Sequence, residues 1–218
     1  MSVCVLDIET NGLEGDRAQL LLATVYDPAT GKYFCFRTWD RSHRRTTTLE
    51  RRALAGLFRR LTRYDLVVTY YGTRFDLPFL RTRSLYYGRR TPKLSAHVDL
   101  YYIVRWQLRL SSNSLANVTR LARMKETKLR LPREVLDQSP FIRPVVQRAL
   151  QRRCVSDTRL TWQLATSLVR VLNSDGRAFQ ALRKAVRETG TRKSRKMKRL
   201  CVPGSHSSSK PLPRTAGA

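Results

Sequence analysis

The sequence predicts an α/β fold, with a mixed β-sheet and helices on both of its faces. Three apolar, strand-like runs come first, and a short turn-forming stretch joins the last two of them, which indicates an antiparallel hairpin. Helical patterns then alternate with buried strand patterns, as they do in βαβ connections. The length of 218 residues and the 41% hydrophobic content suit one globular domain with an appendage.

The three leading strands are expected at residues 2–9, Gln19–Tyr26 and Lys32–Trp39. Turn residues fill the stretch Asp27–Gly31, so the second and third strands are predicted to pair directly. Thr46–Thr48 then offers hydroxyl groups that can cap a helix. Apolar side chains recur with helical spacing from there, at Leu49, Ala53, Leu57 and Leu61.

A buried strand and a second helix follow. Asp65–Tyr71 is a continuous apolar run of the type found in strands covered on both faces, and Gly72 ends it. Asp76 opens the next helix, because Asp is a good N-cap and Pro78 is tolerated in a first turn. This helix is expected to stop at Gly88.

The next elements are a strand, predicted at His97–Val104, and a short helix capped within Ser111–Ser114. Residues 125–145 are polar and interrupted by prolines, so an irregular connection is expected there. Val155–Leu172 has the pattern of an amphipathic helix. The apolar face of the short helix is predicted to hold Leu115, Val118, Leu121 and Ala122.

The composition changes after the amphipathic helix. We place the main domain at residues 1–174, a basic helical extension at 175–200 and a disordered tail at 201–218. Arg192–Arg199 is almost entirely basic. This segment is interpreted as a tether for nucleic acid or as a docking segment for a partner, although an idle solvated tail has the same composition.

The charge indicates a polyanionic partner. The chain carries 43 Lys and Arg against 16 Asp and Glu, a formal charge of +27, with a pI near 11.2. Because the excess is not confined to the tail, nucleic acid is the expected partner. A basic surface can also serve solubility or reflect an arginine-rich proteome. No membrane partner is expected, because the sequence shows no lipidation motif and no apolar span.

The cysteines indicate neither a disulfide framework nor a zinc site. Cys4, Cys35, Cys154 and Cys201 are scattered, without a Cys-x-x-Cys pair, and fit reduced core residues. The N-terminus lacks the pattern of a signal peptide. A cytoplasmic or nucleoid-associated location is therefore expected.

Asp7 and Glu9 predict half of a metal site. They lie two residues apart in an apolar run, so in a strand their side chains share one face. Two close carboxylates raise each other's pKa values, and a divalent cation with oxygen ligands relieves that cost. Asp76 is a further candidate, because it follows the end of a buried strand, where sites form in α/β sheets. The alternative is that Asp76 only caps its helix.

Two motifs in order resemble a known family. Leu-Asp-Ile-Glu-Thr-Asn-Gly-Leu at 6–13 and Tyr-Gly-Thr-Arg-Phe-Asp-Leu-Pro-Phe-Leu at 71–80 are similar to the first two motifs of the DEDD, or DnaQ-like, 3′–5′ exonucleases of the ribonuclease H-like superfamily. The YprB-type branch is the most similar, since Val98-Asp99-Leu100 and Ser114–Val118 resemble its Asp-Leu strand and Ser-Leu helix. The resemblance spans roughly residues 3–172. It implies a ribonuclease H-like fold with five strands in the order 3-2-1-4-5, beginning with an antiparallel hairpin.

The resemblance also implies a site for two divalent ions, Mg²⁺ or Mn²⁺, held by four carboxylates. Three of them are Asp7, Glu9 and Asp76. Asp157 is the best fourth, because it stands at the start of the last amphipathic helix, as the third motif of the family does. Asp137 and Asp175 compete for that place, and a simple helix cap is the alternative for Asp157.

Contacts to nucleic acid are implied beside the motifs, at Thr10, Asn11, Gly12, Leu13, Tyr71, Arg74, Phe75 and Arg153. A set of aromatic residues around the expected site can stack unpaired bases or pack in the core. These are Tyr70, Tyr71, Tyr86, Tyr87, Tyr101, Tyr102 and Trp106.

The chain departs from the family at two points. Family enzymes carry a His or Tyr four or five residues before the last Asp, where it orients or deprotonates water, and here Arg153 and Arg152 stand there. His97 is a possible substitute base, or a structural histidine. Tyr71 replaces the usual Asn of the second motif.

The expected activity is metal-dependent 3′–5′ exonucleolytic hydrolysis of DNA or RNA, on single strands or 3′ ends. One alternative is a catalytically weak or inactive module that binds nucleic acid. The other is a structure-selective endonuclease on the same fold.

Overall fold

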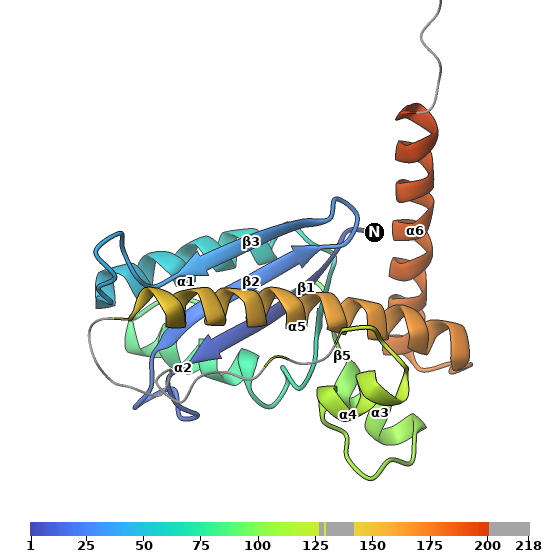
Figure 1. Ribbon diagram of the computed structural model, residues 1–218, viewed down its shortest axis with the longest axis horizontal. Helices are drawn as coiled ribbons and strands as arrows, with labels where there is room; N and C mark the ends of the chain where they lie inside the picture. Colours follow the sequence, from blue (N-terminus) through green and yellow to red (C-terminus); the bar gives the residue numbers. More distant parts are fainter. Residues whose placement is uncertain (127–128, 130–141, 201–218) are drawn as a thin grey trace, which may run out of the picture.

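The computed structural model describes residues 1–126, 129 and 142–200 (Figure 1). The elements are β1 (Val3–Thr10), β2 (Leu20–Asp27), β3 (Lys32–Arg37), α1 (Thr47–Leu61), β4 (Leu66–Thr69), α2 (Asp76–Tyr86), β5 (His97–Asp99), α3 (Leu100–Gln107), α4 (Leu115–Leu121), α5 (Pro144–Val171) and α6 (Arg177–Leu200).

The strands form one mixed sheet in the order β3-β2-β1-β4-β5, which confirms the predicted order. β1 and β2 pair antiparallel, as do β2 and β3, whereas β4 runs parallel to both β1 and β5. The β1–β4 pairing ends where Val5 meets Val68. The second half of β1 therefore extends beyond β4. In α/β sheets, ligand-binding sites form at this edge, beyond the carboxyl ends of the parallel strands.

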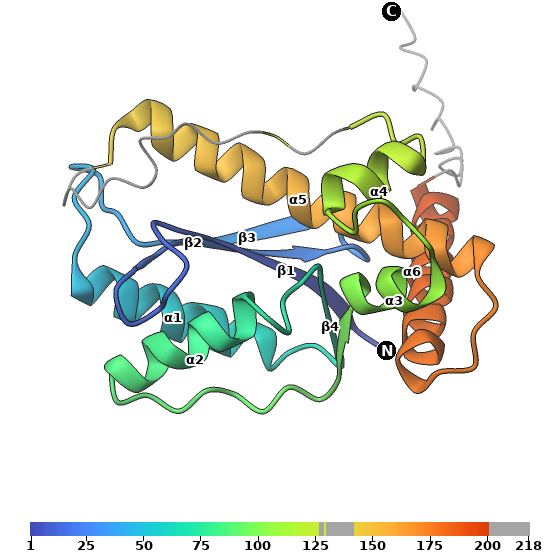
Figure 2. The same ribbon diagram turned by 90° about the horizontal axis from the view of Figure 1, so that it is seen from below.

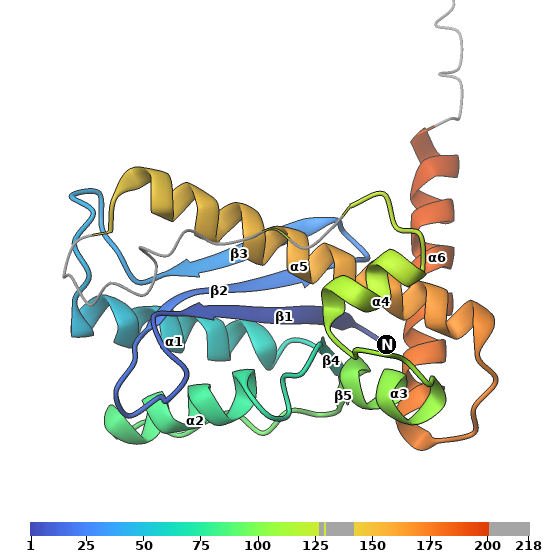
Figure 3. The ribbon, with the colours of Figure 1, turned by 60° about the horizontal axis from the view of Figure 1, so that its bottom comes forward.

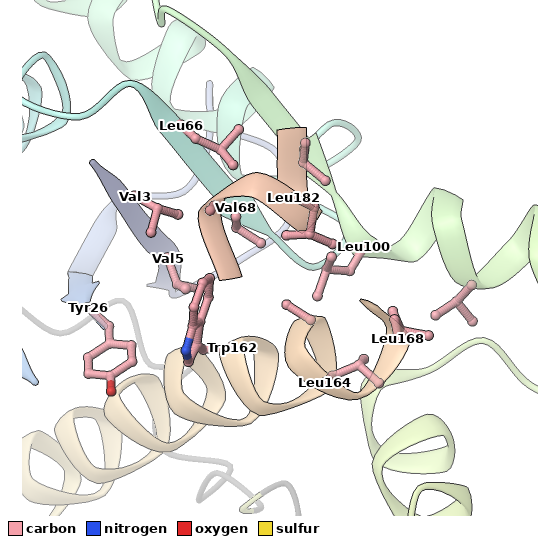
Figure 4. Packing of buried hydrophobic residues seen from close by; sticks show 14 of the residues in the cluster. Val3, Val5, Tyr26, Leu66, Val68, Leu100, Trp162, Leu164, Leu168 and Leu182 are labelled. Carbon is pink, nitrogen blue, oxygen red and sulfur yellow. The ribbon is translucent and has the colours of Figure 1, made fainter. Parts of the chain in front are cut away.

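Helices cover both faces of the sheet. In Figure 2, α5 lies over one face, and α1 and α2 lie over the other. Along β1, Cys4, Leu6 and Ile8 pack with the α1 and α2 side. Val3 and Val5 belong to the core that α5 completes with Trp162, Leu164 and Leu168 (Figure 4). Asp7 and Glu9 continue the Val3–Val5 phase, so they face α5.

The remaining helices gather at the β4–β5 edge, where Figure 3 shows α3 and α4 beside the strand ends. α6 meets α5 near the same edge (Figure 1), and its Leu182 and Ala185 join the core cluster of α5. The Met1 amino group forms an ion pair with Glu188 of α6. The predicted helix in 175–200 is thus present, and the domain boundary at 174 stays a prediction.

The strand predicted at His97–Val104 is wrong beyond Asp99. The chain turns into α3 there because the Asp99 carboxylate accepts a hydrogen bond from the Tyr101 backbone N–H at 3.1 Å, which caps a helix. Leu100 and Val104, one helical turn apart, are both fully buried. In α4, Leu115 and Val118 are buried as predicted, whereas Leu121 and Ala122 face outward.

Helix α5 begins at Pro144, not at Val155. Proline is tolerated at the first helical position, because its missing N–H would have no helical partner there. The rest of the irregular connection predicted at 125–145, with Asp137, lies largely outside the described residues. So do the predicted tail at 201–218, Cys201 and His206. Cys4, Cys35 and Cys154 are free thiols. None of the helices in the described residues has the length and apolar character that a membrane span requires.

Candidate metal centre

Strand β1 supplies the first two carboxylates. Glu9 is 6% exposed and Asp7 is partly buried, and both lie past the last β1–β4 pair. β1 still pairs with β2 here, since Asp7 stands opposite Thr24 and Glu9 opposite Leu22. The backbone of the motif is therefore fixed on one side, while the other side is open to the start of α2.

Asp76 supplies the third carboxylate and is not a helix cap. The N-cap of α2 is Phe75, which makes no side-chain capping bond. Asp76 is instead the first helical residue, and its Oδ1 accepts a hydrogen bond from the Ile8 backbone N–H of β1 at 3.1 Å. This bond holds the carboxylate beside Asp7. Burial, and then the nearby charge of Asp7, raise the pKa of Asp76 well above its usual value.

The fourth carboxylate, Asp157, comes from the middle of α5. It is 1% exposed and lies more than three turns inside the helix, so it is not a helix cap. Cys154 fastens this part of α5 to β1, because its thiol donates to the Asp7 carbonyl oxygen at 3.3 Å. Burial raises the pKa of that thiol well above its usual value, which keeps the S–H donor protonated.

The four carboxylates line one cavity of about 610 Å³. Oxygen atoms of Asp7 and Glu9 lie within 4.8 Å of one another and of the Cys154 sulfur. Carboxylate oxygens are the ligands that hard divalent cations take, whereas a protonated thiol is not. Burial, and then the charge of Asp7, disfavour the ionised form of Asp76, and a bound cation would offset both effects. The donor set fits Mg²⁺ or Mn²⁺.

Arg153 lines the cavity, and it stands at one of the two positions where the resemblance led us to expect a His or Tyr. Its Nε is 3.1 Å from Glu9 Oε1 and 3.6 Å from Asp157 Oδ2. The guanidinium thus forms ion pairs with carboxylates of the first and third motifs. It neutralises part of the negative charge, and a guanidinium offers only N–H donors, so it does not replace a general base.

Tyr71 and Tyr101 form an aromatic wall of the cavity. Their rings meet edge to face, with centroids 4.7 Å apart. Tyr71 has a left-handed backbone, with φ at 68°. Asp99 holds this turn, because its two carboxylate oxygens accept from the Tyr71 N–H at 2.7 Å and the Thr73 N–H at 2.8 Å. Sequence reasoning missed this role of Asp99, because it placed Asp99 inside a strand that was expected to continue to Val104.

Gly72 completes the same turn. A side chain there would meet Thr69, since a Cβ on Gly72 would lie 2.5 Å from the Thr69 Cβ. This close approach explains why glycine stands between Tyr71 and Thr73.

The predicted nucleic-acid contacts divide into two groups. Thr10, Leu13, Phe75 and Tyr71 line the cavity together with Arg153. Asn11, Gly12 and Arg74 are not among its lining residues. Asn11 is buried and braces the loop after β1, since its Oδ1 accepts from the Gln19 N–H at 2.7 Å. A Cβ on Gly12 would lie 2.9 Å from the Ala18 Cβ, so Gly12 allows the same loop to close.

Two other candidates lie away from the carboxylates. His97 lines a different cleft, and its Nε2 is hydrogen-bonded to Thr69 Oγ1 at 2.9 Å. Burial lowers its pKa. Asp175 is exposed beyond the end of α5 and does not line the cavity, so Asp157 is the fourth carboxylate that the geometry brings in. Asp137 lies outside the described residues.

The predicted aromatic set also divides. Tyr70, Tyr71 and Tyr101 line the cavity, whereas Tyr102 and Trp106 line the cleft that holds His97. Tyr87 donates a hydrogen bond to Glu50 at 2.8 Å, and its ring meets that of Tyr86 edge to face.

The sequence is similar to a protein family and to a known DNA polymerase. The model of the RNase_H superfamily matches residues 4–130. A DNA polymerase from Methanocaldococcus jannaschii is 26% identical over 139 residues, which cover 54% of this chain and 8% of the polymerase. The chain therefore spans only a small part of that relative.

Two solved structures share the fold. The family B DNA polymerase from the archaeon Pyrobaculum calidifontis aligns with a TM-score of 0.61 at 21% identity, over 78% of this chain and 24% of the polymerase. A structure described as the apo form of the nuclease aligns with a TM-score of 0.51 at 16% identity, over 94% of this chain and 90% of the other.

Proposed function

The chain belongs to the RNase_H superfamily, and from this premise we propose that it is a metal-dependent nuclease that hydrolyses phosphodiester bonds in nucleic acid. The observation that carries the proposal is the convergence of Asp7, Glu9, Asp76 and Asp157 on one cavity. Three separate elements, β1, α2 and α5, supply these carboxylates. A purely structural role would not explain why four acidic side chains gather in a protein with a net charge of +27.

We further propose 3′–5′ exonuclease activity with two Mg²⁺ or Mn²⁺ ions. The order and spacing of the first two motifs support it, as does Asp157 on α5. When bound, such ions lower the pKa of water and stabilise both oxygens of an in-line displacement at phosphorus. The four carboxylates would hold them. The Cys154 thiol, with its hydrogen bond to Asp7, would keep β1 and α5 in register around the ions.

Arg153 is proposed to bind the substrate phosphate. Its guanidinium donates in a planar fork that matches phosphate oxygens, and its present partners, Glu9 and Asp157, are proposed metal ligands. Ions that take over these carboxylates would release the guanidinium for the phosphate. Without a His or Tyr base the reaction loses general base catalysis, which typically contributes about 10² to 10⁴-fold.

The proposed substrate is a single strand or a 3′ end of DNA or RNA. The rings of Tyr71 and Tyr101 give a surface on which an unpaired base can stack. The exposed Leu13 lies at the same cavity, where it can contact the strand. The net charge of +27 favours binding to the phosphate backbone. A cytoplasmic or nucleoid-associated location stays a prediction from the sequence.

The alternative of an inactive binding module is favoured by one observation. Arg153 already forms ion pairs with two of the four carboxylates, so it competes with cations for them. On this alternative, the cavity holds a strand without cutting it. A structure-selective endonuclease is the remaining alternative.

Cleavage of end-labelled single strands and of branched duplexes distinguishes these functions. With Mg²⁺ or Mn²⁺ we expect a ladder that recedes from the 3′ end, abolished in Asp7→Asn and in Asp157→Asn. Asp175→Asn is the matched control, because that carboxylate is exposed and outside the cavity, and it should cleave like the unaltered protein. Binding without cleavage in either metal would establish the binding module. Internal cuts at junctions, with 3′ ends left intact, would establish an endonuclease.

A further inference from the structure

A second cleft lies behind the Tyr71–Thr73 turn, and no step of the proposed hydrolysis uses it. Its volume is about 330 Å³, and β5, α3 and the start of α6 form its walls. Figure 3 shows α3 and α6 near the same edge of the sheet. The aromatic residues among its lining are Tyr102 and Trp106 of α3 and Phe179 of α6.

Trp106 is the most telling of these residues. Its side chain is 74% exposed, whereas Trp39 and Trp162 are 8% and 7% exposed. Tryptophan is enriched at interfaces, because its large aromatic surface packs against a partner while its N–H can still form a hydrogen bond. The Arg105 guanidinium carbon lies 5.8 Å from the Trp106 ring centroid, which places a cation beside the indole.

The polar groups of the cleft suit an uncharged, planar ligand. Gln107 and Ser174 offer a carboxamide and a hydroxyl. Burial lowers the pKa of His97, so its ring is neutral at neutral pH. Asp99 also lines the cleft, but its oxygens already accept from the backbone N–H groups of Tyr71, Thr73 and Tyr101. Aromatic planes with neutral donors and acceptors are what a nucleobase requires.

The two cavities are neighbours across one thin wall. Tyr71 and Tyr101 line the carboxylate cavity, while Thr73 and Tyr102 line the second cleft. Asp99 ties the wall together through the Tyr71 and Thr73 backbone. The exposed Arg74, Arg105 and Arg177 each stand next in sequence to a residue of the cleft, so phosphates that cross the wall would meet basic neighbours.

We propose that the second cleft is a nucleobase subsite, in which an unpaired base of the bound strand stacks on Trp106. The strand is the one whose scissile phosphate lies at the four carboxylates, so the inference rests on the proposed nuclease function. The base lies on the far side of the Tyr71–Thr73 turn. Strands too short to cross the turn therefore bind without the subsite.

Binding of oligothymidylates, from a dinucleotide to an octanucleotide, tests the subsite with Ca²⁺ replacing Mg²⁺ to limit cleavage. Oligomers above a threshold length should quench the fluorescence of the exposed Trp106. Trp106→Ala should lower the affinity for the same oligomers by about fivefold to a hundredfold, which corresponds to the free energy of base–aromatic stacking. The dinucleotide should bind both proteins equally. Trp106→Phe keeps an aromatic ring, so its loss of binding free energy should be less than half of the loss in Trp106→Ala.

Abasic oligomers locate the base. One abasic position should reproduce the weakening seen in Trp106→Ala, and combining the two changes should weaken binding no further, because each removes the same stacking interaction. If Trp106→Ala weakened the binding of oligomers of every length equally, or of none, the proposed subsite would be refuted. Normal cleavage by Trp106→Ala together with either result would leave the nuclease proposal intact. No binding and no cleavage by the unaltered protein would instead refute the nuclease itself.

Discussion

Asp76 gives the site a defined pH dependence at the scale of single residues. Its pKa is raised from the usual 3.8 by burial and by Asp7. The folded protein therefore holds this proton more tightly than the unfolded chain does. The metal-free protein loses stability from Asp76 as the pH rises from about 3.8 through the raised pKa, and above that pKa the loss is complete.

Asp76→Asn should remove this dependence, because an amide cannot ionise and its oxygen can still accept from the Ile8 N–H. In EDTA, the melting temperature of Asp76→Asn should exceed that of the unaltered protein by a margin that grows with pH. The margin should vanish near pH 3.8. Thermal unfolding across the pH range measures it, with exposed Asp175→Asn as the control. A variant that melts lower at alkaline pH would contradict the proposed charge crowding.

Arg153 should weaken metal binding. Its guanidinium is 3.1 Å from Glu9 and 3.6 Å from Asp157, and it is 21% exposed. Close like charges repel by a few kcal/mol at an effective dielectric constant of about 20, and part of this is lost when the side chain swings away. Arg153→Ala should therefore bind Mn²⁺ about tenfold more tightly, a change of about 1.4 kcal/mol.

Calorimetric titration with Mn²⁺ measures that change. Arg152→Ala is the matched control, since Arg152 is the adjacent arginine, is exposed, and lies outside the carboxylate cavity. Its affinity for Mn²⁺ should change less than twofold or so, because an exposed charge is well screened. Equal affinity in Arg153→Ala and the unaltered protein would show that the guanidinium does not compete with cations.

At the scale of elements, a buried ion pair joins α1 to α2 and supports the loop that follows β1. Arg83 Nε and Nη2 donate to the Glu50 carboxylate at 2.7 and 2.8 Å, and both residues are almost fully buried. Arg83 also donates to the Gly15 carbonyl at 3.0 Å, and Glu50 accepts from the Leu20 N–H at 3.0 Å. The pair therefore fixes the middle and the C-terminal end of the loop that carries Leu13.

Arg83→Ala should lower the free energy of unfolding by about 3 to 5 kcal/mol, because it leaves the buried Glu50 charge without its main partner. Urea unfolding measures the loss. The control is Arg159→Ala, which breaks a half-exposed pair with Glu126 and should cost about 1 kcal/mol or less. If the two variants lost the same free energy, the buried pair would not be a main support of the loop.

The helices and strands also show which elements could be predicted from local sequence patterns. The hairpin and the helix from Thr47 followed from the sequence, because strand periodicity, turn residues and a threonine cap are local signals. The strand order, which the structure confirms, came from the resemblance and not from a local pattern. The end of β5 was not predicted, because the apolar and aromatic run from Leu100 to Val104 suits either a strand or a helix. The hydrogen bond that Asp99 accepts from the Tyr101 N–H, together with the burial of Leu100 and Val104, favours the helix.

The candidate site was predictable where the backbone is regular. Asp7 and Glu9 share a face in any strand, and their position followed directly. Asp76 and Asp157 needed the resemblance, because no local pattern says that α2 and α5 meet β1 at the same point. The ion pairs of Arg153 and the role of Asp99 in the Tyr71 turn depend on contacts between distant segments, which one sequence does not contain.

At the scale of the whole molecule, helix α6 has two parts, one that packs on the core and one that is basic. Phe179, Leu182, Ala185 and Thr189 of this helix are buried against the body. The helix then continues to Leu200 beyond the sheet (Figure 1). The first half of α6 thus completes the core, and the second half carries a basic sequence away from it.

Removal of residues 192–218 should separate these two parts, because Phe179, Leu182, Ala185 and Thr189, the side chains of α6 described as buried, precede the cut. The deletion removes Arg192, Lys193, Arg195, Lys196, Lys198, Arg199, Lys210 and Arg214. The shortened protein should melt normally and cleave saturating substrate at the same rate. Its affinity for single strands should depend less on salt. The slope of log K against log salt concentration should become less steep by about 0.7 for each phosphate that these side chains neutralise. Fluorescence titrations at several salt concentrations measure the slope. An unchanged slope would show that the basic segment neutralises no phosphates, and that the arginines of residues 1–191 account for nucleic-acid binding.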